Sequence, residues 1–217
     1  MPFGFGRKKE PQPAASGEGV APGAQERPPR TIQFLGLTEE WRLQGTMSIA
    51  GRLLDNLNKR EAIALSDVTW APLDGSGRYE PAPGIQAVDP YDLIVVIAGP
   101  DTLAAIGEDE RSAHRVHKIT FDVALQAPPL RVIGTVQLNP GTEPSGLLER
   151  SSQMFVAVTR PAILLADTQL EFDDAIDAAL VNRFYLRGVD QVDLVTGERH
   201  VRLPGKPLGG TTWQERG

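Results

Sequence analysis

The sequence repeats itself, and this repetition narrows the choice of folds. Four segments of the first half return in the second half with apolar residues and glycines at similar places. The matching pairs are Leu43–Ile49 with Val132–Leu138, Leu53–Asp55 with Leu147–Glu149, Ile63–Ser66 with Val156–Thr159, and Ile97–Gly99 with Leu186–Gly188. Gly45 and Gly99 lie 54 positions apart, and so do Gly134 and Gly188. The pattern predicts one β-rich module present twice.

Hydrophobic periodicity indicates β-structure in both modules. In Leu43–Ile49 apolar or small residues occupy alternate positions, which is typical of a half-buried strand. Asp92–Ala98 is apolar on both faces and predicts a strand that is covered on both sides. We expect helical turns only at Leu53–Asn58, Leu147–Ser151 and Asp173–Leu180. The expected fold is mainly β, with two tandem small β-barrels of about five strands each, because barrel closure removes exposed strand edges.

Composition divides the chain into four parts. Residues 1–30 are rich in Pro, Gly, Ala and Glu and predict a disordered tail. Residues 31–110 and 111–203 are the two modules, and residues 204–217 are a flexible Gly/Pro-rich tail. Because each module is small for a single core, we expect one module to pack on the other.

Three aromatic residues in the tails are candidates for docking onto a partner, although the N-terminal tail also suits a purely solubilising role. They are Phe3, Phe5 and Trp213. No apolar run reaches the length of a membrane-spanning helix, and the N-terminus lacks the apolar stretch of a signal peptide. We therefore expect a soluble, cytoplasmic protein.

Charge and cysteine content exclude several classes of chemistry. The chain has no cysteine, so disulfides, thiolate nucleophiles and cysteine-bound metal centres are excluded. Residues 31–110 carry five Lys/Arg against thirteen Asp/Glu, whereas residues 111–217 carry twelve of each. An acidic field repels phosphate backbones, so the first module is not expected to bind nucleic acid in general.

Two segments resemble the motifs of Sm-like small β-barrels. Phe184–Leu194 is similar to the second motif of that family, an apolar strand that ends in Ile-Arg-Gly. Leu43–Met47 followed by Asp55–Asn58 resembles the first motif, a strand with a central glycine and a loop with Asp and Asn. The segments Leu53–Trp70 and Leu147–Ile163 are also similar to short bacterial β-domains of unknown function. The resemblance implies modules with Sm-like or SH3-like topology.

In Sm-like proteins that bind RNA, the loop Asn holds a base and the Arg stacks on it. The candidate RNA-binding residues here are Asp55, Asn56, Asn58, Arg187 and Gly188. The transfer is incomplete, because the first module has Ala98 in place of the arginine. The second module has Arg187 but carries Glu149–Ser152 in the loop. The resemblance therefore leaves open a site split between the modules or a loss of RNA binding.

Motifs for catalysis or metal binding are weak. The sequence has no phosphate-binding glycine loop and no Gly-x-Ser-x-Gly elbow. His114 and His117 would point to opposite faces of a strand. The acidic cluster comprises Glu171, Asp173, Asp174 and Asp177 and lacks the spacing of a calcium loop. Asp173 or Asp174 better suits the first turn of a short helix.

Trp41 and Trp70 lie in strand-like stretches and predict core packing, although base stacking is an alternative.

The leading hypothesis is a non-catalytic interaction or assembly protein with no cofactor and no metal. It would recognise a protein partner, or a second copy of itself, through strand edges and loops. Asp92–Ala98 and Val181–Gly188 are the expected pairing edges. Sm-like RNA binding through Arg187 and Asp55–Asn58 is the alternative, and a small-ligand sensor is a weaker one. The identity of any partner is not predicted.

Overall fold

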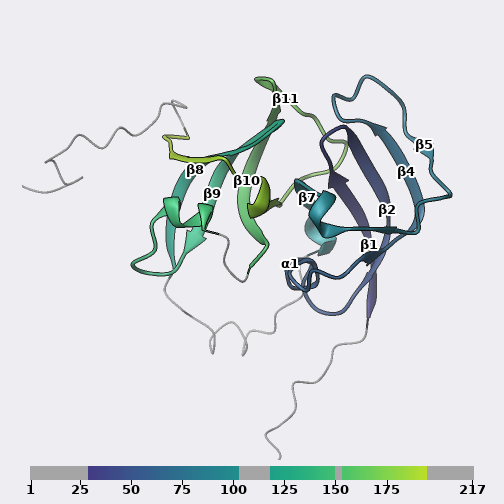
Figure 1. The fold of residues 1–217 in the computed structure, drawn as a ribbon, viewed down its shortest axis with the longest axis horizontal. Helices are drawn as coiled ribbons and strands as arrows, with labels where there is room; N and C mark the ends of the chain where they lie inside the picture. Colours follow the sequence, from purple (N-terminus) through teal and green to yellow (C-terminus); the bar gives the residue numbers. More distant parts are fainter. Residues whose placement is uncertain (1–28, 103–117, 150–152, 195–217) are drawn as a thin grey trace, which may run out of the picture.

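A computed structural model describes residues 29–102, 118–149 and 153–194 (Figure 1). The described part is mainly β, with antiparallel pairing in every ladder and a single short α-helix. The mainly β prediction is therefore confirmed. We call residues 30–102 the first half and residues 118–194 the second half.

The first half contains seven strands and three helical turns. They are β1 Arg30–Leu37, β2 Trp41–Ile49, α1 Leu53–Leu57, β3 Ile63–Ala64, β4 Ser66–Pro72, β5 Glu80–Pro81, β6 Ala87–Val88, the 3-10 turn η1 Pro90–Asp92, β7 Val95–Ala98 and the 3-10 turn η2 Pro100–Thr102. The second half contains β8 Ile119–Ala127, β9 Leu130–Leu138, the 3-10 turn η3 Pro144–Leu148, β10 Phe155–Leu165, β11 Thr168–Gln169, β12 Ala178–Asn182, the 3-10 turn η4 Arg183–Tyr185 and β13 Gly188–Gln191.

The two halves share one continuous sheet. Its order is β13-β8-β9-β10-β12-β7-β1-β2-β4-β5, β11 pairs with β10, and β3 and β6 form a separate ladder. In each half the last strand returns to the first, so β7 lies beside β1 and β13 beside β8. The halves meet where β7 pairs with β12, and Figure 1 shows β7 between the strands of the two halves.

The described strands form no closed barrel, so the expectation of two separate closed barrels is not met. The barrels stay open because of how β12 pairs. It pairs with β10 of its own half on one side and with β7 of the other half on the other side. The joint covers two of the strand edges that closure would have hidden, those of β7 and β12.

Two buried clusters lie on the two faces of this joint. Val96 and Leu180 belong to one cluster, whereas their sequence neighbours Val95 and Val181 belong to the other. Successive strand residues point to opposite faces, so β7 and β12 are covered on both sides. This agrees with the expectation that Asp92–Ala98 contains a strand covered on both faces. Each cluster draws side chains from both halves, as the expected packing of one module on the other requires.

Several local expectations need correction. Asp173–Leu180 is not a helix, because its last residues belong to β12 and its first residues, Asp173 and Asp174, lie in a bend. Pairing with β10 and β7 outweighs the helical propensity of the local sequence. Val181–Gly188 is not one strand either, because η4 interrupts it. Leu53–Asn58 contains α1, with Asn58 as its C-cap. Of the helical turn expected at Leu147–Ser151, Leu147 and Leu148 belong to η3, and residues 150 and 151 lie outside the described residues.

Gly45 and Gly134 have like surroundings. Each lies in the second strand of its half, where the ladder to the next strand shifts register. A Cβ at Gly45 would lie 3.0 Å from a backbone oxygen of the facing strand, and one at Gly134 would lie 2.8 Å from such an oxygen. The residue after that oxygen has a positive φ in both halves, 54° at Asp67 and 50° at Arg160. Both glycines therefore admit a close backbone approach at a bulge.

Gly99 and Gly188 do not correspond in the structure. Gly188 opens β13 and pairs with Gln126 of β8. The residue in that place in the first half is Val95, which pairs with Leu37 of β1. Gly99 follows β7 instead, four residues further on. The equal spacing of the glycine pairs does not reflect equivalent positions, because the segment from Gly134 to Val156 is four residues longer than the segment from Gly45 to Ile63.

Candidate functional site

The β13 strand has one strand neighbour in the described part of the chain. It ends the sheet and pairs only with β8, from Gly188 opposite Gln126 to Gln191 opposite Val123. The N–H of Val192 donates to the carbonyl oxygen of Asp122 over 3.1 Å. Because hydrogen-bonded pairs alternate along an antiparallel ladder, the main-chain groups of Val189 and Gln191 face away from β8. These groups have no strand partner among the described residues.

An open groove of about 480 Å³ adjoins this edge. Its walls are Ile119 and Phe121 of β8, Val189–Gln191 of β13, and the loop Gly141–Ser145. Ile119 is 42% exposed, which is high for a large apolar side chain in a sheet. The groove therefore places apolar surface next to main-chain groups of Val189 and Gln191 that have no strand partner in the described part of the chain, a combination that suits an extended peptide.

The corresponding strand of the first half is covered. All four residues of β7 are buried, because β12 pairs with its outer edge from Val95 opposite Val181 to Ala98 opposite Ala178. The same strand position is thus occupied in one half and open in the described part of the other.

Arg183 holds one wall of the groove in place. This buried side chain donates from Nε to the carbonyl oxygen of Leu147 over 2.9 Å and from Nη2 to that of Gly146 over 2.9 Å. Burial lowers the pKa of the Arg183 guanidinium, and the charge of Glu149 acts in the opposite direction. The cation thus satisfies carbonyl oxygens of η3, whose first two residues, Pro144 and Ser145, line the groove.

Two asparagines fasten the halves to each other. Oδ1 of Asn58 accepts hydrogen bonds from the N–H groups of Met154 and Phe155, over 2.7 and 2.8 Å. Nδ2 of Asn182 donates to the carbonyl oxygens of Pro90 and Leu93, over 3.2 and 2.8 Å. The joint therefore consists of polar links as well as strand pairing and apolar packing.

Asn182 was not predicted from the sequence. The sequence signal was an Asn directly after an apolar run, a residue type that often caps a turn. Asn182 caps η4 and Asp89 caps η1, and each side chain accepts a hydrogen bond from the N–H two residues later. Arg42 adds a further link between the halves, since Nη1 donates to the carbonyl oxygen of Glu171 over 3.1 Å and the guanidinium lies 5.4 Å from the ring centroid of Phe172.

The residues expected to bind RNA have other contacts. Nδ2 of Asn56 donates to the carbonyl oxygens of two residues before α1. Oδ1 of Asn58 accepts from the N–H of Met154 in the second half. Nη1 of Arg187 donates to the carbonyl oxygens of Phe184 and Leu186. Asp55 is exposed on α1, and Gly188 opens β13. Within residues 29–102, 118–149 and 153–194, no hydrogen bond, ion pair or ring contact brings Arg187 to this loop.

Other expected residues are placed as follows. Phe3, Phe5, Trp213, His114 and His117 lie outside the described residues. The described ranges contain no group of three or more His, Asp or Glu side chains placed to hold a metal ion, which covers the acidic cluster near Asp173.

Trp41 and Trp70 stack on each other with ring centroids 4.6 Å apart, and Trp70 packs against the first buried cluster. This packing agrees with the core role expected for the pair.

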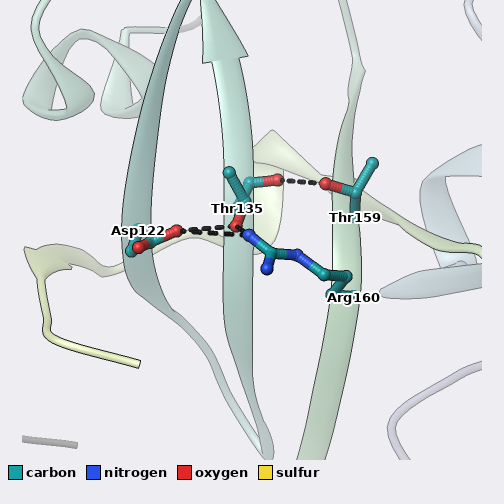
Figure 2. A network of polar contacts seen from close by, with 4 residues as sticks. All are labelled: Asp122, Thr135, Thr159 and Arg160. Carbon is teal, nitrogen blue, oxygen red and sulfur yellow. Dashed lines mark hydrogen bonds and ion pairs between the residues drawn. The ribbon is translucent and has the colours of Figure 1, made fainter. Parts of the chain in front are cut away.

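A polar network crosses three strands of the second half (Figure 2). The hydroxyl of Thr135 donates to Oδ1 of Asp122 over 2.6 Å and accepts from Nη2 of Arg160 over 2.8 Å. The hydroxyl of Thr159 donates to the carbonyl oxygen of Thr135. The carboxylate of Asp122 also lies 4.0 Å from Nη2 of Arg160, so the network holds Arg160 at the bulge in β10.

No family model, no curated protein and no solved structure matches this chain. Among the described residues, none of the helical segments has the length and apolar character needed to cross a membrane.

Proposed function

We propose that this protein is a non-catalytic interaction or assembly component that binds an extended segment of a protein partner along β13. The observation that carries the proposal is the contrast between the two equivalent strands. β7 is covered by an added strand, whereas β13 shows an open edge and a groove in the described chain.

The proposed mode of binding is strand addition. An added strand would pair with the outward main-chain groups of Val189 and Gln191, each hydrogen bond adding a net of about 0.5–1.5 kcal/mol. Alternate side chains of the added strand would enter the groove beside Ile119 and Phe121. Main-chain pairing supplies affinity, and the groove supplies selectivity.

We further propose that the two halves descend from one small β-module of Sm-like or SH3-like topology that was duplicated. The like surroundings of Gly45 and Gly134, the bulges opposite them and the return of the last strand to the first in each half support this origin. On this proposal, each half is an open barrel whose edge is available for pairing.

RNA binding receives less support from the contacts. The acceptor oxygen of Asn58 is occupied by two main-chain N–H groups, and the guanidinium of Arg187 is tied to its own turn. A small-ligand sensor also has less support, because the groove is open and suits an extended chain.

A site-specific cross-linking experiment tests the proposal. A photoreactive amino acid is placed at position 119 in the groove and, as a control, at position 76, where Ser76 is exposed in the segment between β4 and β5. In cells, adducts to protein should form from position 119 and far less from position 76. Gln191→Pro removes an outward-facing N–H and should abolish the adduct, because proline cannot donate to an added strand.

A second pair of variants guards against misfolding of Gln191→Pro. Val189→Lys adds a charge in the groove, whereas Thr120→Lys adds the same charge at an exposed position of β8 outside the groove lining. The lysine at position 189 should weaken adduct formation, and the one at position 120 should leave it unchanged. Equal adducts from positions 119 and 76, or adducts that persist in all edge variants, would remove the proposal.

A further inference from the structure

The two strands that pair in the joint, β12 and β7, each have a counterpart in the other half of the chain. In the joint, β12 adds to the outer edge of β7, and the N–H of Asn182 donates to the carbonyl oxygen of Ile94 over 2.8 Å. The strand of the first half that corresponds to β12 is β6. Val88 of β6 pairs with Ile63, just as Val181 of β12 pairs with Val156.

The turns that follow β6 and β12 confirm this correspondence. Asp89 accepts from the N–H of Tyr91 over 2.9 Å, and Asn182 accepts from the N–H of Phe184 over 3.0 Å. Each capping side chain directly follows its strand and opens a 3-10 turn that leads to the last strand of its half. The correspondence of β6 with β12 and of β7 with β13 is thus carried by pairing and by turn geometry.

β6 also has a single strand neighbour in the described part of the chain. It pairs only with β3, and the N–H of Leu65 donates to the carbonyl oxygen of Gln86 over 2.9 Å. Since Gln86 and Val88 face β3, the main-chain groups of Ala87 between them face outward. The chain therefore presents two unlike edges, β6 and β13, which correspond to the two strands that pair in its own joint.

We infer that a second copy of this chain docks head to tail, with β6 of one copy added to β13 of the next in the register of the β12–β7 joint. This inference rests on the proposed function, since it names the partner of the β13 edge. The joint pairs Leu180 with Val96, so the new contact pairs Ala87 with Val189 of the second copy. The N–H of Asp89 then donates to the carbonyl oxygen of Arg187 of the second copy.

Charge favours this arrangement over pairing of two like edges. Residues 31–110 carry thirteen acidic against five basic residues, and residues 111–217 carry twelve of each. Contact between two first halves would bring two acidic surfaces together, whereas head-to-tail contact joins an acidic half to a neutral one. A head-to-tail contact is heterologous, so it generates chains or rings rather than a closed two-fold dimer.

The contact between copies should be weaker than the internal joint. Met154 directly precedes β10, the strand that neighbours β12, Phe155 is the first residue of β10, and both are fully buried. Their counterparts before β3 are Glu61 and Ala62, which are exposed and contribute little apolar surface. We therefore expect association that depends on protein concentration.

Complementary variants provide a sharp test in the full-length chain. Ala87→Pro removes the outward N–H of β6, and Gln191→Pro removes an outward N–H of β13. Sedimentation velocity should show that the wild type forms larger species as concentration rises and that each variant alone is monomeric. An equimolar mixture of the two variants should form dimers and nothing larger, because only one intact β6 can meet one intact β13. Circular dichroism verifies that each variant is folded, and Val189→Lys replaces Gln191→Pro if the proline unfolds the chain.

Three results would overturn the inference. These are a wild type that stays monomeric at millimolar concentration, an Ala87→Pro variant that still dimerises, and a mixture that does not form dimers from folded variants. If the wild type is monomeric while position 119 cross-links to another protein in a manner that depends on Gln191, the head-to-tail inference fails and the proposed function stands. If neither self-association nor any adduct occurs, both fail.

Discussion

Replacing Asn58 by alanine should destabilise the whole described fold, because this one side chain serves two buried donors. Its Oδ1 lies 2.7 Å from the nitrogen of Met154 and 2.8 Å from that of Phe155, and both residues are 0% exposed. A buried donor left without an acceptor costs about 1–3 kcal/mol. Two such donors place the expected loss in the free energy of unfolding at about 2–6 kcal/mol, and we expect about 3 kcal/mol after partial relaxation.

Urea denaturation measures this loss. Two of the three tryptophans, Trp41 and Trp70, lie in the first half, so tryptophan fluorescence measured in a Trp213→Phe background reports on that half, and far-ultraviolet circular dichroism reports on both halves. A lower midpoint with an unchanged slope and coincident transitions is the expected result, because Asn58 joins the halves into one cooperative unit.

Two matched variants isolate the role of the Asn58 oxygen. Asn58→Asp keeps an acceptor at the same place and should recover most of the stability that Asn58→Ala loses. Asn56→Ala removes an amide that donates to two exposed carbonyl oxygens, so it should cost about 1 kcal/mol or less. The reasoning is refuted if Asn58→Ala is no less stable than Asn56→Ala, or if Asn58→Asp is as unstable as Asn58→Ala.

Two further predictions concern backbone packing and pH. Gly134→Ala should lower the free energy of unfolding by about 2–3 kcal/mol, because the added Cβ would lie 2.8 Å from a facing carbonyl oxygen. Gly45→Ala should lower it somewhat less, since the corresponding distance is 3.0 Å. Gly84→Ala has open space around the Cβ and should stay within about 0.5 kcal/mol of wild type in urea denaturation. Equal costs for all three glycines would contradict this. Burial raises the pKa of Tyr79 and Tyr185, so their neutral forms are favoured in the folded chain. The resulting stability is present below the unfolded tyrosine pKa of about 10 and is lost as pH rises through the higher folded pKa. Tyrosinate absorbance should therefore rise at a higher pH in native protein than in urea-unfolded protein.

Much of the local structure could be predicted from the sequence. Alternation in Leu43–Ile49 indicated a half-buried strand, and the apolar run before Gly99 indicated a strand covered on both sides. These inferences succeed because the side-chain period of a strand is local and leaves a direct pattern in the sequence. The helix expected at Asp173–Leu180 is wrong for the opposite reason, since β12 forms there through pairing with strands that lie far away in the chain.

The candidate site was largely out of reach of the sequence. Val181–Gly188 was expected as a pairing edge, but the structure divides it between β12, which is covered, and the start of β13, which is at the end of the sheet. Asn58 was expected in an RNA site and in fact caps two N–H groups of the other half. A short polar side chain in a loop has the same sequence pattern in either role, and only its spatial neighbours distinguish them.

The sequence alone determined the mainly β character and the repeated module pattern, because the side-chain period of a strand acts between near neighbours. The crowding that requires glycine at positions 45 and 134 comes from Ser66 and Thr159, which lie 21 and 25 residues away, so it belongs to the tertiary structure. Tertiary structure alone decided that β7 takes β12 as its neighbour, that no barrel closes among the described strands and that β13 is left at the end of the sheet. Strand pairing is made by main-chain groups that every residue carries, so the choice of partner depends on the packing of both halves together.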